Sequence, residues 1–210
     1  IAALLIGRKI MRISRAILAI AVLAIFGGCS DKQKADVEKI KQDVTAELAE
    51  LSGVDKNRFF AHDGVEVTPD GDGFNVRVAN VRMMPDQPQP MTVGAIDFHL
   101  VPKGDDQYDI SNLKLPSPLN FTDPAGGQVK IEIGDQQFKG LWSKTLNTFL
   151  TADATYRSMK LVDPSGGEAT FEEITASTAS TDKGSGLWDQ STKAAVKNMQ
   201  IKDAQGIMVM

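Results

Sequence analysis

A four-residue pattern that recurs at four places constrains the fold of this chain most. Each copy has a small polar residue, an apolar residue, a long polar residue and a second apolar residue. The copies begin at Asn80, Asn112, Ser158 and Asn198, which are 32, 46 and 40 residues apart. Repeats of this length are typical of supersecondary units that stack side by side. The pattern therefore predicts repeated strand pairs laid next to one another in one elongated sheet.

Apolar and polar residues alternate along several segments, which is typical of half-buried strands. Val65 and Val67 on one side and Phe74, Val76 and Val78 on the other flank the turn sequence Asp-Gly-Asp-Gly at 70–73 and predict a hairpin. Further turn sequences stand at 103–106, 123–127 and 163–167. We expect a mainly β protein built on an antiparallel meander, in a β-repeat domain that spans residues 59–210.

The last two repeat units resemble each other beyond the shared pattern. The turn at 163–167 repeats the turn at 123–127, and Gly-Leu-Trp occurs at both 140–142 and 186–188. After the fourth copy, residues 203–210 resemble the turn and the opening strand of a fifth unit. We therefore expect the repeat domain to continue beyond Met210.

Residues 35–52 have helical periodicity. Their apolar positions are three or four residues apart, and Gly53 follows as a stop signal. The positions are Val37, Ile40, Val44, Leu48 and Leu51. An amphipathic helix that covers one face or end of the sheet is favoured over a membrane-surface helix, which would have a basic polar face. Residues 143–150 and 191–197 are expected to form short helices packed on the sheet, which makes the fold class α+β.

The segment before Cys29, the only cysteine, has the organisation of an export signal. Arg12 and Arg15 follow Met11, residues 16–26 are apolar, and two glycines precede Cys29. A run of eleven apolar residues is shorter than the roughly 20 that span a bilayer, which argues against a transmembrane helix. A buried free thiol is the other alternative. Residues 1–10 precede Met11, and we interpret them as an upstream or non-native extension.

This segment resembles the lipobox of bacterial lipoproteins. The resemblance implies that residues 11–28 are a signal peptide, that cleavage occurs before Cys29 and that the thiol carries a lipid. Residues 29–34 would then be a lipidated tether. The resemblance also implies a periplasmic protein anchored to a membrane by lipid. Because Ser30 and not aspartate follows Cys29, the outer membrane is favoured over the inner membrane.

The charge and the residue types exclude several kinds of function. Loss of residues 1–28 would remove four basic and no acidic residues, which changes the net charge from −4 to −8. Such a surface repels phosphate backbones, so nucleic acid is not an expected partner. His62 and His99 lack metal-ligand spacing, and Asp70 with Asp72 fits a tight turn better than a calcium loop. The sequence predicts no metal, no cofactor and no enzymatic activity.

The expected function is the binding or handling of a lipid or another hydrophobic ligand in the cell envelope. From about residue 74 to 210 the repeated pattern loosely resembles the β units of AsmA-like envelope proteins, which implies lipid handling. An apolar sheet face would form the ligand site, with Val76, Val78, Ile96, Phe98, Leu100, Val129, Ile131 and Ile133. The alternative is a structural envelope lipoprotein that binds a protein partner and no ligand.

Overall fold

The computed structural model describes residues 31–52, 60–83, 91–122, 126–184 and 187–209. The chain divides into two units, Ile1–Asp36 and Val37–Met210. Almost all described residues belong to the second unit, and the fold given below is that of the second unit. Cys29 and the expected extension and signal peptide, residues 1–28, lie outside the described residues.

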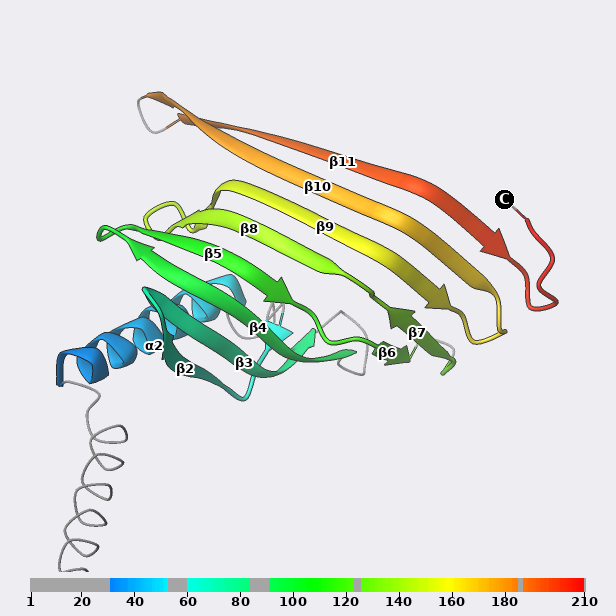
Figure 1. The fold of residues 1–210 in the computed structure, drawn as a ribbon, viewed down its shortest axis with the longest axis horizontal. Helices are drawn as coiled ribbons and strands as arrows, with labels where there is room; N and C mark the ends of the chain where they lie inside the picture. The colour runs from blue at the N-terminus through cyan, green and yellow to red at the C-terminus, as the bar shows by residue number, and fades with distance from the viewer. Residues whose placement is uncertain (1–30, 53–59, 84–90, 123–125, 185–186, 210) are drawn as a thin grey trace, which may run out of the picture. The chain divides into compact units, whose positions relative to one another are not determined.

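The described residues form one helix and eleven strands, all paired antiparallel in a single sheet (Figure 1). The helix is α2 (Asp31–Ser52), which begins four residues before the predicted start. The strands are β1 (Phe60–Ala61), β2 (Gly64–Asp70), β3 (Gly73–Met83), β4 (Met91–Lys103), β5 (Gln107–Lys114), β6 (Leu119–Thr122), β7 (Gln128–Glu132), β8 (Gln136–Ser143), β9 (Thr148–Val162), β10 (Glu168–Gly184) and β11 (Leu187–Lys202).

The sheet is a meander in which strands that follow one another in sequence lie side by side. The order along the sheet is β1-β3-β4-β5-β8-β9-β10-β11, with β2 on the outer side of β3. The hairpin of β6 and β7 is inserted between β5 and β8, and β7 continues the line of β8 along β9. The mainly β fold, the antiparallel meander and the hairpin across residues 70–73 are confirmed.

The repeated pattern marks a backbone irregularity. Asn80, Asn112, Ser158 and Asn198, the first residues of the four copies, all have positive φ angles, between 48° and 54°. This left-handed conformation is uncommon for residues other than glycine, and asparagine tolerates it better than most. Asn80 lies at a register shift between β3 and β4, and Asn112 lies at a register shift between β4 and β5. At Asn80 and Asn112 the pattern therefore marks a β-bulge. The pairing of β10 with β9 and with β11 keeps its register past Ser158 and Asn198.

A bulge inserts one extra residue, so the residues on either side of it keep the same face of the sheet. Val78 and Val81 are three positions apart, yet both are buried, with 3% and 7% exposure. In an unbroken strand, residues three apart would point to opposite faces. The bulge at Asn80 thus lets one apolar face continue along a long, bent strand.

The two short helices expected on the sheet are not present. Residues 144–147 form a turn between β8 and β9, and residues 191–197 lie within β11. The turn is held by Asp106, which accepts hydrogen bonds from the backbone N–H and the hydroxyl of Thr145. Residues 191–197 pair along their length with β10. Strand pairing therefore overrides the weak helical periodicity of both segments.

Helix α2 packs on the sheet and forms the main core with it. Ile40 and Val44 are buried against Val65, Val76 and Leu100 on β2, β3 and β4. This confirms that the apolar side of the helix covers part of one sheet face (Figure 1). The side chain of Leu51 lies outside the described ones.

Polar contacts also join the helix to the sheet. The hydroxyl of Tyr108 donates a hydrogen bond of 2.6 Å to Asp43, and the indole of Trp142 donates one of 3.3 Å to Glu47. Burial and the contact with Asp43 raise the pKa of Tyr108. Partial burial raises the pKa of Glu47. These contacts satisfy the two aromatic donors and fix where α2 lies on the sheet.

Candidate functional site

An apolar cavity of about 430 Å³ lies beside the main core. Strands β3 and β4 form its floor with Val78, Val81, Met83, Met91, Val93, Ile96 and Phe98. Its sides come from α2, β1, β5 and β6 and from the residue that follows β5. These side residues are Leu48, Phe60, Leu113, Leu115, Leu119 and Phe121. Every described residue that lines the cavity is apolar, and none has a side chain that could hydrogen-bond to a ligand.

Backbone bulges bring these residues together. Asn80 lies between Val78 and Val81, and on the neighbouring strand Gly94, with a φ of 102°, lies between Val93 and Ile96. The bulges allow residues three apart to line the same cavity. A side chain at position 94 would be strained at this φ, and its Cβ would come within 3.1 Å of Pro116.

Polar contacts with Asp63 hold the bulge at Asn80 in place. Asp63 accepts a hydrogen bond of 2.6 Å from the amide of Asn80 and another of 2.6 Å from Arg82. These two hydrogen bonds lower the pKa of Asp63, with the contribution of Arg82 the larger. The residue with the left-handed backbone is therefore tied to the loop that precedes β2.

The eight residues predicted to bind a ligand fall into three groups. Val78, Ile96 and Phe98 line the cavity. Val76 and Leu100 are almost fully buried in the core beneath α2, each with 1% exposure. The remaining three lie in or just after β7 and outside the cavity lining: Val129 and Ile131 are half-buried and Ile133 is buried. The structure thus brings Val78, Ile96 and Phe98 together in the cavity and places the other five outside its lining.

Sequence reasoning missed most of the cavity wall. Val81, Met83, Leu113 and Leu115 are apolar positions of the first two copies of the repeated pattern, but the strict alternation rule placed them outside the ligand set. A bulge at the first position of the pattern would have predicted them. Phe60, Leu119 and Phe121 carry no local signal, because only tertiary packing brings them to β3 and β4.

The apolar face continues beyond the cavity toward β9. The ring of Phe149 packs edge-on against Phe138 and Trp142, with centroid distances of 5.4 and 4.9 Å. Trp142 also packs against the main core, as expected for a core anchor. Trp188, its counterpart in the next unit, is 40% exposed on β11.

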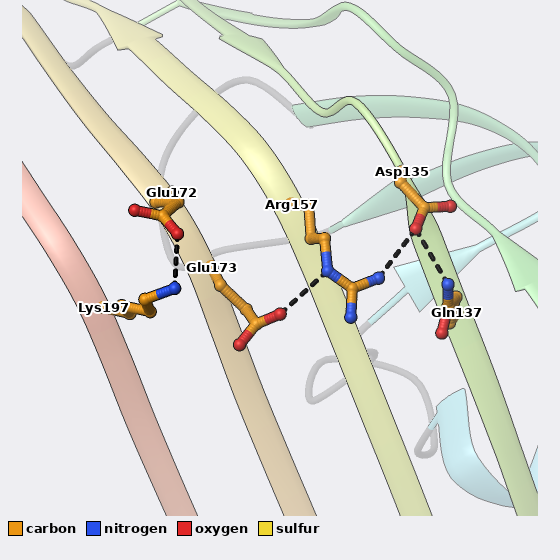
Figure 2. A network of polar contacts seen from close by, with 6 residues as sticks. All are labelled: Asp135, Gln137, Arg157, Glu172, Glu173 and Lys197. Carbon is orange, nitrogen blue, oxygen red and sulfur yellow. Dashed lines mark hydrogen bonds and ion pairs between the residues drawn. The ribbon is translucent and has the colours of Figure 1, made fainter.

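The opposite face carries a row of ion pairs (Figure 2). Arg157 donates hydrogen bonds of 2.9 Å to Asp135 and 2.8 Å to Glu173, and these raise its pKa. On the next strand Lys197 pairs with Glu172 at 2.5 Å. Hydrogen bonds from Lys197 and Asn198 lower the pKa of Glu172. One face of the sheet is therefore apolar and the other is charged.

Comparisons of the chain with protein-family models, curated proteins and solved structures give no match.

The described histidines and acidic residues form no cluster suited to a metal ion. In this part of the chain, no group of three or more His, Cys, Asp and Glu side chains could hold a metal ion. His99 lies on β4, where its Nε2 is 3.3 Å from the carbonyl oxygen of Asp70. His62 lies in the loop before β2. Within the described residues, no helix is both long enough and apolar enough to cross a membrane.

Proposed function

We propose that this protein is a lipid-anchored protein of the bacterial cell envelope that binds an apolar ligand, such as an acyl chain of a lipid. The observation that carries this proposal is the cavity of about 430 Å³ whose described lining is entirely apolar. Its size falls within the range of about 300–1,000 Å³ that is usual for ligand pockets.

The lining favours a hydrocarbon chain over a polar metabolite. A ligand with hydroxyl, amide or charged groups inside the cavity would lose hydrogen bonds to water and gain none from the wall. An acyl chain has no such groups, and each buried methylene contributes about 0.8 kcal/mol. The polar part of a lipid would remain outside, in contact with water.

The anchor would keep the cavity near a source of lipid. The helix that provides Leu48 to the cavity wall begins two residues after Cys29. Acylation of Cys29 adds about 0.8 kcal/mol per buried methylene to membrane binding, and more than one chain gives a stable anchor. The proposed location is the periplasmic side of the outer membrane. Within this proposal the protein binds and does not catalyse, and the AsmA-like resemblance stays a prediction.

Filling the cavity should weaken ligand binding. Ile96→Trp places a larger ring where the acyl chain would lie, so we expect the affinity for a fluorescent fatty acid to fall at least about tenfold. The measurement is a fluorescence titration of the full chain carrying Cys29→Ser. Ile174→Trp is the matched control, because Ile174 lies on β10 outside the cavity lining. Unchanged binding by Ile96→Trp, or an equal loss in both variants, would contradict the proposed site.

Lipidation at Cys29 can be tested separately from ligand binding. Expressed in a bacterium with an outer membrane, the wild-type chain should fractionate with that membrane, and its mass should show an acylated Cys29 as the first residue. Cys29→Ser removes the thiol, so the chain should stay out of the lipid-bearing fraction. The measurements are membrane fractionation and intact mass. An unprocessed wild-type chain with a free thiol would rule out the anchor but leave the cavity proposal standing.

A further inference from the structure

The apolar cavity has a long and narrow floor. On β4 its lining extends from Met91 to Phe98, which is roughly 20 Å at the usual rise of about 3.3 Å per residue. The floor is only two strands wide, because β3 provides the other floor residues and neighbouring strands lie about 4.8 Å apart. A linear chain therefore fits along the strands, and the two ends of the floor determine how long that chain can be.

Phe98 and Leu48 form the end of the cavity that meets the main core. Both side chains line the cavity, and both also pack against the core cluster. Phe98 is in register with Val76 on β3, and Leu100 follows it two positions later on β4. Val76 and Leu100 are each 1% exposed beneath α2. The sheet face past Phe98 is therefore filled by closely packed side chains, which a ligand cannot enter without displacing them.

The opposite end of the floor has less tightly packed side chains. Its described residues are Phe60, Met83 and Met91, and Met83 is in register with both of the others. All three are half-buried, and none of them packs against the core cluster. Methionine side chains are flexible and adapt to a neighbouring group. The polar end of a lipid would lie at this partly exposed end, because its polar groups need contact with water.

We propose that Phe98 and Leu48 set the maximum length of the acyl chain that the cavity accepts. The terminal methyl group of the chain lies against these two side chains, and the polar end of the ligand lies toward Met83 and Met91. The inference rests on the proposed function and deepens it, because it names the ligand class as lipids with a single linear chain of limited length. A longer chain would have to push Phe98 into the packed core, which costs more than the extra burial contributes.

A series of saturated fatty acids measures this limit. Acids that range from about 10 to about 20 carbons compete with the fluorescent fatty acid for the full chain carrying Cys29→Ser. Each methylene that enters the cavity should tighten binding by up to about fourfold. For the wild-type cavity the gain should stop at the chain length that reaches Phe98, and longer acids should bind no more tightly. The length at which the gain stops is the quantity compared between variants.

Two substitutions shorten the wall from different elements. Phe98→Leu acts on β4 and Leu48→Ala acts on α2, and each removes three carbon atoms from the end of the cavity. Space opened in an apolar wall can hold an apolar ligand, so the limit should move to acids about two carbons longer in each variant. Ile110→Ala is the matched control for lost core packing. Ile110 also packs against the core cluster but lies outside the cavity lining, so its variant should keep the wild-type limit.

Several results would overturn the inference while leaving the proposed function standing. They are an unchanged limit in both Phe98→Leu and Leu48→Ala, an equal shift in Ile110→Ala, or a wild-type affinity that keeps rising with chain length. Met91→Ala tests the orientation of the ligand, because truncation at the opposite end should weaken all lengths alike and leave the limit in place. A shift in Met91→Ala alone would reverse the assignment of the two ends. Absence of binding at every length would contradict the proposed function itself, and the inference with it.

Discussion

Leu100→Ala is expected to lower the free energy of unfolding by about 3 kcal/mol. Leu100 lies on β4 with 1% exposure, between α2 and the sheet. Truncation removes three buried carbon atoms and leaves a void among Ile40, Val44 and Val76, which are anchored on separate elements and cannot all close in. The main core would therefore lose part of the contact that holds α2 to the sheet. Urea denaturation followed by circular dichroism measures the change.

Leu187→Ala is the control for this prediction. It makes the same chemical change at a side chain that is 67% exposed on β11. We expect a change within about 0.5 kcal/mol, as for most surface substitutions. If Leu100→Ala were as mild as Leu187→Ala, the packing of α2 on the sheet would be wrong.

Asn112→Val is expected to destabilise the protein by about 1–3 kcal/mol through the backbone alone. Asn112 has a φ of 53°, and its side chain is exposed, so little packing is lost when it is replaced. A β-branched residue is strongly disfavoured in the left-handed region. Asn112→Gly adopts this conformation without steric cost and should retain nearly all of the stability. Thermal unfolding of both variants distinguishes these results.

Lys114→Val provides the comparison within the same strand. Lys114 is exposed on β5 and is not among the residues with positive φ. Valine there should be neutral or slightly favourable, because it suits an ordinary strand position. Equal effects of Asn112→Val and Lys114→Val would mean that position 112 has no bulge. In that case Leu113 and Leu115 would not share the cavity with Ile96.

The same bulge links stability to ligand binding. Asn112→Val, if it shifts the strand by one residue, turns Leu113 and Leu115 away from the cavity. The fluorescent fatty acid used for Ile96→Trp would therefore also report on this variant. Asn112→Gly should bind like the wild type, because its backbone keeps the bulge.

Several parts of the fold follow from local sequence patterns. The alternation in residues 65–67 and 74–78, with the glycine-containing turn between them, predicted the β2–β3 hairpin. The spacing of Ile40, Val44 and Leu48 predicted the covering helix. Residues 143–150 and 191–197 were predicted wrongly as helices. Their periodicity extends over seven or eight residues only, and pairing with neighbouring strands outweighs such a weak preference.

The candidate site was predicted less well than the fold. Val78, Ile96 and Phe98 were expected on one apolar face and do line the cavity. Val76 and Leu100 belong to the same alternating runs, but α2 covers them. The alternation of apolar and polar residues predicts which face of the sheet a residue occupies. It does not predict which part of that face a helix covers.

The amino-acid sequence by itself determined the β2–β3 hairpin, the covering helix and the four points at which the repeated pattern recurs, because each depends on residues that are close together in the chain. Only the tertiary structure decided that the first residue of each copy is left-handed and that the apolar residues around Asn80 share one face. It also decided where α2 leaves that face uncovered beside Ile96. These features depend on register and packing between distant segments, which no local pattern specifies.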